Sequence, residues 1–420
     1  MKKVLIIGSG ISGLSIGRML SDKYDLEILE REEQCGGMIK CERVNGNLFH
    51  KVGGHVFNSH NQDVLNWFWG QFNRDEEFLK ALRNAKIHLG GQIIGYPLEN
   101  FLYQLPEQKL KPIVEELLQK LSEKKIYISD YRNFKDFLIG NFGNELYELY
   151  FGPYNSKIWN TNLENVPLDW LDGKLPMPNL HEVIYNNIVK KEESNMVHSS
   201  FFYAKKDGSQ FIVNRLAEGL PINCSYNVSS IELIDNNHLT VNNGDRIADV
   251  LIYCGDVRQL HKMIQIKDAP LQEALLKVAV LPSNGTSNVL CETDPNDLSW
   301  LYLPELKYKA HRIIYTGNFS STNNEGSTRK TCVVEFSGKR EQPEMLNEIK
   351  RLPGNLKALA FNYEPNSYII QNETTRDDIS TLKTLLKPYH IFLLGRFAEW
   401  EYYNMDKCIE AAMKLRTENF

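Results

Sequence analysis

The chain has 420 residues, of which 42% are hydrophobic and 24% are charged, and its formal net charge at pH 7 is −5. This length predicts two or three domains, and the slightly acidic balance gives no reason to expect nucleic-acid or anionic-membrane binding. Because apolar runs are short and the seven cysteines lack paired spacing, we expect a cytoplasmic protein with no signal peptide, membrane span, disulfide framework or metal site.

Residues 4–30 predict a dinucleotide-binding unit. The run VLII is typical of a strand buried on both faces, and Gly8 to Gly13 match the pattern G-x-G-x-x-G. Gly8 would allow a tight turn, Gly10 a close approach of the backbone to a pyrophosphate, and Gly13 the packing of the next helix on the strand. Glu30 ends the second strand, where a carboxylate can accept hydrogen bonds from the ribose of an adenosine. The alternative, an ordinary glycine-rich turn, does not explain these offsets.

A second glycine pair, Gly36-Gly37, follows Glu30 closely. It would let the backbone approach the far half of a longer cofactor, which favours FAD over a nicotinamide dinucleotide. The segment E-R-E-E-Q-C-G-G resembles the FAD-binding pattern of the amine oxidase and protoporphyrinogen oxidase class.

The next part of the chain predicts hairpins followed by helices. Residues 39–60 contain Asn45-Gly46, a hairpin signal, and residues 61–85 have the apolar spacing of a helix. A further hairpin is expected around Gly90-Gly91. Residues 99–195 are rich in Lys and Glu with helical periodicity, which predicts a mostly helical insertion.

The rest of the chain predicts a return to the first unit and then a sheet. Residues 205–258 predict a helix followed by strands, and residues 259–280 predict a helix. Short alternating runs between residues 285 and 375 predict an antiparallel sheet that forms a substrate platform. An apolar strand near residue 391 leads through a Gly-Arg turn to a closing helix.

These elements together predict an α/β fold made of three parts. The expected parts are a discontinuous Rossmann-like FAD-binding domain (1–60, 200–258 and 387–420), a mainly helical inserted domain with a lid segment (61–199), and an antiparallel β-sheet substrate domain (259–386).

Three further segments carry a family resemblance. VGGHVFNSHNQDV resembles the G-P-H-I-F-H-T segment of the UDP-galactopyranose mutase family, and YNSKIWNTNLENVP resembles its Y-T-x-K-Q-W-G segment. GRFAEWEYYNMD resembles G-R-L-G-T-Y-R-Y-Y-D-M of the same family. Their order and approximate spacing match along essentially the whole chain.

The resemblance implies an enzyme with noncovalent FAD that is active in its reduced form. In that family the flavin N5 attacks the anomeric carbon of a UDP-sugar, UDP leaves, and the sugar ring recloses as a furanose for polysaccharide synthesis. The implied partners are a UDP-sugar and an external reductant, and a homo-oligomer stays open.

The resemblance also implies roles for individual positions, although Tyr154 and Trp159 also fit core packing and Arg312 also fits a solvated surface. It implies catalytic roles for His55 and Arg312. Cofactor contacts are implied for Gly8, Gly10, Ile11, Ser12, Gly13, Glu30, Arg31, Gly37, Met38, His55, Val228, Gly395, Arg396, Asn404 and Met405. Substrate contacts are implied for Tyr154, Trp159, Lys174, Arg312, Tyr368 and Tyr402.

Several positions depart from the family pattern. Pro178 stands where the family has a second diphosphate arginine, which Lys174 would replace only as a point charge. Glu99 replaces an amide, Gly54 a proline and Asn58 a histidine. The sugar and the need for UDP therefore stay open. The alternative functions are an FAD-dependent oxidoreductase of the amine oxidase or protoporphyrinogen oxidase class, and a flavin-binding protein without catalysis.

Overall fold

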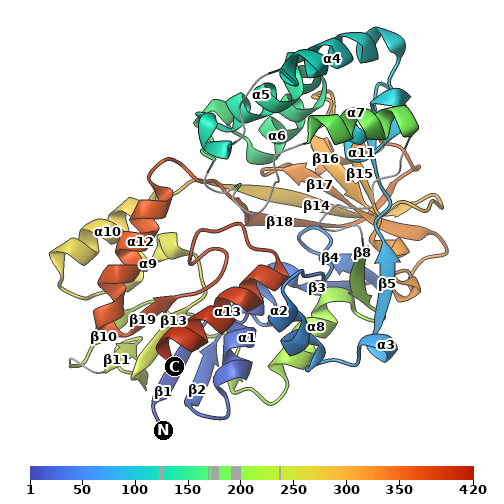
Figure 1. Ribbon diagram of the computed structural model, residues 1–420. Coiled ribbons are helices and arrows are strands. Elements are labelled where there is room, and N and C mark those ends of the chain that lie inside the picture. Colours follow the sequence, from blue (N-terminus) through green and yellow to red (C-terminus); the bar gives the residue numbers. More distant parts are fainter. Residues whose placement is uncertain (123–126, 169–170, 172–178, 191–199, 236–237) are drawn as a thin grey trace.

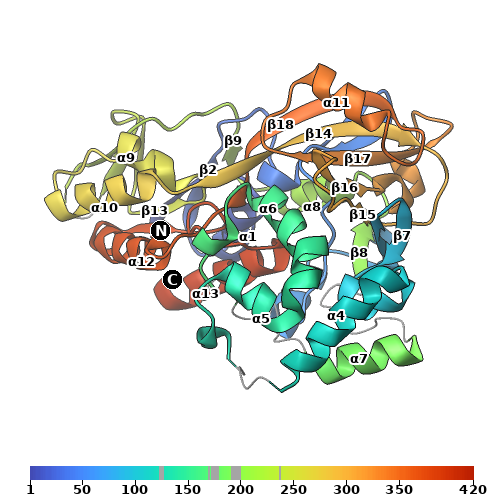
Figure 2. The ribbon, with the colours of Figure 1, turned by 90° about the horizontal axis from the view of Figure 1, so that it is seen from above.

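The computed structural model describes all residues except 123–126, 169–170, 172–178, 191–199 and 236–237. A parallel sheet with its helices, a larger sheet and a helical layer lie against one another (Figure 1). The view from above shows the helical layer beside the larger sheet (Figure 2). The expected α/β class with a Rossmann-like domain is confirmed. No helix in the described part of the chain has the length and apolar character of a membrane span.

The dinucleotide-binding unit is built on a five-stranded parallel sheet of order β19-β13-β1-β2-β9. Its central strand is buried on both faces, as the run VLII predicts: Val4, Leu5 and Ile6 are at most 1% exposed. The two helices α1 and α13 pack against each other beside this sheet. The elements are β1 (Lys3–Ile7), α1 (Ile11–Leu20), β2 (Asp25–Leu29), α8 (Gly208–Ala217), β9 (Ile222–Asn223), β13 (Val250–Tyr253), β19 (Ile391–Leu393) and α13 (Met405–Asn419).

Smaller elements extend this unit. The hairpin around Asn45-Gly46 is present as β3 and β4, and a three-stranded sheet follows β9. The helices α9, α10 and α12 share one apolar core with β13 and β19, so they pack on the dinucleotide-binding unit. These elements are β3 (Cys41–Val44), β4 (Asn47–His50), β10 (Ile231–Leu233), β11 (Leu239–Val241), β12 (Arg246–Ala248), α9 (Leu260–Met263), α10 (Ala269–Ala279) and α12 (Thr375–Leu386).

The larger sheet has seven strands in the order β18-β14-β17-β16-β15-β6-β7. Strands β14 to β18 are antiparallel as expected, but β6 joins β15 in parallel and brings the hairpin partner β7 with it. The sheet therefore includes the predicted hairpin around Gly90-Gly91, which the sequence analysis assigned to the mainly helical inserted domain. The strands are β6 (Ala85–Leu89), β7 (Gln92–Gly95), β14 (Ser283–Thr293), β15 (Trp300–Tyr302), β16 (Ala310–Ile314), β17 (Lys330–Ser337) and β18 (Lys357–Ile369); α11 (Gln342–Ile349) links β17 to β18.

The expected helix over residues 61–85 is only partly correct. The chain forms α2 (Gln62–Trp69) and the short α3 (Arg74–Glu77), and then β5 (Phe78–Leu82). β5 becomes a strand because it pairs with β8 (Ser200–Ala204), a partner far away in the sequence. Phe78 meanwhile keeps its place in the aromatic cluster of α2, with Phe68 and Phe72.

The helical layer covers one end of the larger sheet (Figure 2). Its core of buried Leu, Phe and Tyr side chains is continuous with residues of β6 and β15. The helices are α4 (Glu107–Lys120), α5 (Phe134–Leu146), α6 (Gly152–Trp159) and α7 (Leu180–Val189).

A buried histidine connects the β3–β4 hairpin to β8 by a hydrogen bond. His50 is fully buried, its Nε2 lies 2.6 Å from the Tyr203 hydroxyl, and its Nδ1 lies 3.4 Å from the Cys41 sulfur. The same hydroxyl accepts a 2.8 Å hydrogen bond from the Asn323 side chain. Burial, with His55 nearby, lowers the pKa of His50 to about 3.

This burial predicts an acid-sensitive fold. The unfolded chain binds a proton at His50 near pH 6.5, whereas the folded chain binds it only near pH 3, so stability is lost as the pH falls between these values. One such histidine contributes a slope of about 1.4 kcal/mol per pH unit. We expect the melting temperature of His50→Gln, measured by circular dichroism, to fall less between pH 6.5 and 5 than that of the wild type. The exposed His60→Gln should keep the wild-type slope, and an unchanged slope in His50→Gln would contradict the assignment.

Candidate active site

The first βα turn forms a cradle for a pyrophosphate. Gly8 has a φ of +106°, and a Cβ on Gly13 would lie 1.9 Å from the Gly8 carbonyl oxygen, so both positions require glycine. At Gly10, by contrast, the nearest atom to an added Cβ is the Gly37 Cα at 3.9 Å. The two glycine segments thus lie opposite each other, and no side chain lies within 4 Å of a Cβ added at Gly10. This arrangement leaves room for a phosphate to approach the backbone, as the sequence predicts.

Glu30 lies beside this cradle in a fixed orientation. Its carboxylate accepts hydrogen bonds from the Ser9 amide at 2.8 Å, the Ser9 hydroxyl at 2.6 Å and the Glu32 amide at 3.0 Å. A carboxylate has about four acceptor positions, so about one is left for a ribose hydroxyl. A second position would become available if the serine hydroxyl rotated away. Arg31 instead points to solvent beside Glu32, at 3.2 Å, and Val228 is buried in the loop after β9.

The far half of the cradle is formed by the C-terminal segment. Gly395 has a φ of +98°, and an added Cβ would lie 2.3 Å from the Ser12 hydroxyl, so this turn packs directly on the start of α1. α13 begins at Met405, and the side chain of Asn404 does not cap it. The first amides of α13 are therefore available to an electron-rich acceptor, and the helix dipole favours negative charge there.

Three buried nitrogen atoms beside this half lack protein partners. Nε2 of His55, Nε of Arg312 and Nε of Arg396 have no hydrogen-bond partner among the described residues. Burial, together with the positive charges of Arg396 and Arg312, lowers the pKa of His55 to about 4, so the imidazole is neutral at pH 7. Because buried polar atoms are normally paired, these atoms fit a polar cofactor or substrate between them.

A row of polar side chains crosses the larger sheet next to these atoms. Tyr302, Arg312, Glu335, Asn288 and Asn362 are directly opposite one another on β15, β16, β17, β14 and β18. Residues in this register share one face of the sheet. The far end of the row is tied to the loop before His55, since the Asn362 side chain donates to the Lys51 carbonyl at 2.9 Å.

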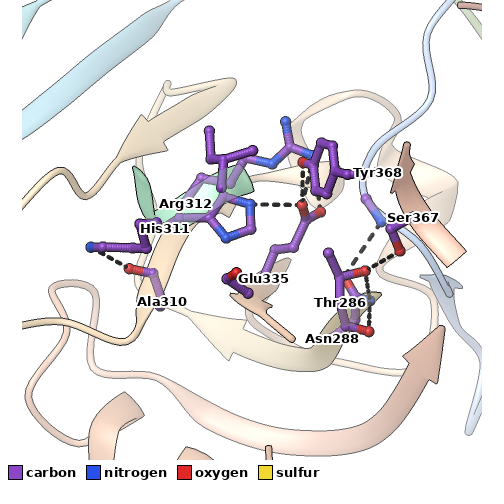
Figure 3. A network of polar contacts seen from close by, with 12 residues as sticks. Thr286, Asn288, Ala310, His311, Arg312, Glu335, Ser367 and Tyr368 are labelled. Carbon is purple, nitrogen blue, oxygen red and sulfur yellow. Dashed lines mark hydrogen bonds and ion pairs between the residues drawn. The ribbon is translucent and has the colours of Figure 1, made fainter. Parts of the chain in front are cut away.

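Glu335 is the centre of this row (Figure 3). Its carboxylate is 1% exposed and accepts from Nε2 of His311 at 2.8 Å, from Arg312 at 2.9 Å to both oxygens, and from the Tyr368 hydroxyl at 2.9 Å. Burial alone would raise the pKa of this carboxyl, but Arg312 and His311 hold it well below its usual range. Glu335 was not among the predicted site residues, although an acid inside the apolar run TCVVEFS is a visible signal of a buried, paired charge.

The predicted aromatic residues converge on the same place. Trp159 lies 6.3 Å from Tyr368 and 6.1 Å from Tyr402 between ring centroids, and the two tyrosine rings are nearly parallel. The guanidinium of Arg396 lies 4.1 Å above the Tyr402 ring. Tyr154 packs one face parallel to a neighbouring tyrosine in the same helical segment, so at most one face is left for a base.

Lys157 ties α6, the helix that carries Tyr154 and Trp159, to the larger sheet. Its Nζ donates to the carbonyl oxygens of Leu303 at 2.7 Å, Glu305 at 2.9 Å and Ala310 at 3.3 Å. Burial lowers its pKa to about 8. No role for Lys157 was predicted from the sequence, because its partners are backbone groups far away in the chain.

The departures from the family pattern have mixed outcomes. Gly54 is required here, since an added Cβ would lie 2.6 Å from the Cγ2 of Ile314. Asn58 donates to the Ser200 carbonyl at 3.0 Å, away from the cradle. Lys174 and Pro178 lie outside the described residues.

The fold and this site define a dinucleotide-binding protein of the flavoprotein type. Residues 6–72 match a family model described as an NAD(P)-binding Rossmann-like domain. The chain is similar to UDP-galactopyranose mutases: it is 22% identical to the enzyme of Mycoplasma genitalium over 98% of this chain and 93% of that protein.

One further relative and two solved structures are similar to this chain. A dTDP-fucopyranose mutase of Escherichia coli is 32% identical over 42% of this chain, and the match spans less than half of that protein, 46%. A crystal structure of reduced UDP-galactopyranose mutase superposes with a TM-score of 0.86 at 20% identity, covering 99% of this chain and 96% of that one. A protein described as a putative protoporphyrinogen oxidase from Exiguobacterium shares the fold with a TM-score of 0.74, 15% identity and coverage of 99% and 97%.

The cradle makes a prediction about Gly10. Gly10 has a φ of −72°, which valine adopts readily, and the added Cβ has room. Gly10→Val should therefore fold but lose FAD, because its methyl groups occupy the space for the pyrophosphate. Flavin absorbance after desalting and circular dichroism measure the two effects. Gly13→Ala is the matched control and should lose the fold itself; a folded Gly10→Val with one FAD per chain would refute the role of Gly10.

The buried carboxylate makes a prediction about stability. Glu335→Gln removes the charge that Arg312 and His311 face, and leaving a buried charge unpaired costs about 3–5 kcal/mol. We expect a melting temperature several degrees below that of the wild type. Glu344→Gln, which removes an exposed partner 3.6 Å from Arg340, should change stability by at most about 1 kcal/mol. Equal losses in the two variants would contradict the central role of Glu335.

Proposed function

We propose that this chain is an FAD-dependent mutase that converts a nucleotide-linked pyranose into the furanose form for polysaccharide synthesis. The observation that carries the proposal is the sequence similarity to a UDP-galactopyranose mutase along 98% of the chain. The similarity to a dTDP-fucopyranose mutase over part of the chain leaves the nucleotide and the sugar to experiment.

The residues of the cradle fit noncovalent FAD. Gly8, Gly10 and the start of α1 would hold the pyrophosphate, Glu30 the ribose, and the amides before and after Met405 the flavin end. When bound and reduced by an external reductant, FAD would supply the nucleophile for the anomeric carbon. The neutral His55 would accept or donate a single hydrogen bond there without adding charge.

The polar row would hold the leaving nucleotide. Arg312 keeps its Nε free of a described protein partner while its terminal nitrogen is fixed by Glu335, so it would present a directed donor to a phosphate oxygen. Tyr402 adds a hydroxyl group close by, and Trp159 closes the apolar side of the sugar position. This arrangement binds and orients the substrate and excludes water from it.

A second candidate function is an FAD-dependent oxidoreductase. The observation that favours it is the neutralisation of Arg312 by Glu335, which leaves less positive charge for a diphosphate than a free arginine would. Such an enzyme would be reduced by its substrate in a one-to-one ratio, whereas a mutase needs only a catalytic amount of reduced flavin.

The proposal predicts furanose formation by the reduced holoprotein. UDP-galactopyranose and dTDP-fucopyranose are each incubated with dithionite-reduced and with oxidised protein, and products are separated by liquid chromatography. We expect at least one sugar to yield a furanose with the reduced protein only. Reduction of the bound flavin by an amine, without any furanose product, would instead establish the oxidoreductase.

A further inference from the structure

A second arginine, Arg83, contacts the polar row at its Tyr302 end. It lies between β5 and β6, and its terminal nitrogen donates to the Tyr302 hydroxyl at 2.5 Å. Its guanidinium carbon lies 5.1 Å from the ring centroids of both Tyr96 and Trp300. Three aromatic side chains therefore hold the orientation of this cation.

The charges of the two arginines are balanced differently. Arg312 faces both oxygens of Glu335 at 2.9 Å, so this pair is neutral overall. Arg83 has no carboxylate within 4.0 Å among the described residues, and its Nε has no hydrogen-bond partner there. Aromatic rings attract a cation but do not neutralise it, and buried charges are normally paired. Arg83 therefore carries a positive charge that no carboxylate within 4.0 Å balances in the described part of the chain, and so does Arg396, whose terminal nitrogen donates to the Ser367 carbonyl at 2.7 Å.

The hydroxyl between the two arginines is constrained to donate. Arginine has only donors, so the Tyr302 oxygen accepts from Arg83 and its own proton points to another acceptor. Tyr302 is directly opposite Arg312 on the neighbouring strand and lies 5.4 Å from the Tyr154 ring, at an interplanar angle of 84°. Arg83, Tyr302 and Arg312 therefore present donors in one line beside Tyr154.

We propose that Arg83 is an anion-binding residue of the substrate site, where it contacts a phosphate of the nucleotide diphosphate together with Tyr302. The proposal rests on the proposed function for the identity of the ligand, while the charge and geometry apply to any phosphate. The proposal also explains how the site can lack an arginine at Pro178, where the family pattern has one. In this chain the second cation would be Arg83, which comes from the turn before β6.

Binding to the oxidised, FAD-loaded holoprotein tests the proposal by calorimetry with UDP, inorganic pyrophosphate and uridine. Arg83→Met keeps the apolar stem but removes the charge, and we expect it to weaken UDP and pyrophosphate binding about 10- to 100-fold while uridine binding is unchanged. Arg83→Lys keeps the charge without the planar fork and should recover part of the affinity. Arg340→Met, a surface arginine paired with Glu344, is the matched control and should bind as the wild type does.

The outcomes separate this inference from the proposed function. Pyrophosphate binding that depends on Arg83 supports the anion site even when no furanose forms. Equal UDP affinity in the wild type and a folded, FAD-loaded Arg83→Met overturns the site, as does an equal loss for uridine, which would reflect disturbed packing. A wild type that binds neither UDP nor pyrophosphate also overturns it.

Discussion

The polar row of the proposed substrate site depends on one buried carboxylate. A buried acid is stable only when donors surround it, and Glu335 on β17 obtains them from His311 and Arg312 on β16 and from Tyr368 on β18. Satisfying one residue therefore fixes the register of β16, β17 and β18 and the direction of the Arg312 side chain. Two of the predicted substrate residues, Arg312 and Tyr368, are held in place by this network.

Close contacts of backbone atoms shape the proposed cofactor site. One loop connects this site to the proposed substrate site. Close contact of Gly13 with Gly8 and of Gly395 with Ser12 brings α1 and the C-terminal turn together. The loop that carries His55 is linked to the far end of the polar row through Lys51. The proposed cofactor site and the proposed substrate site are thus parts of one packed structure.

The parts that the sequence predicted are those with local physical causes. The glycine turn and the acid at position 30 follow from residues that are close in the chain, and the hairpin at Asn45-Gly46 follows from turn chemistry. The polar row was not predictable, because Tyr302 and Asn288 become neighbours of Arg312 and Glu335 only through strand register across long connections. The recruitment of β6 and the pairing of β5 have the same cause.

The contact between Gly54 and Ile314 limits how this site can change in evolution. A side chain at position 54 is blocked by a methyl group of β16 that lies 2.6 Å from the required Cβ. A protein of this lineage can therefore gain a larger residue at position 54 only after position 314 has become smaller, since the reverse order passes through an overpacked intermediate. The two positions form an epistatic pair, in which the history of one decides which substitutions the other tolerates.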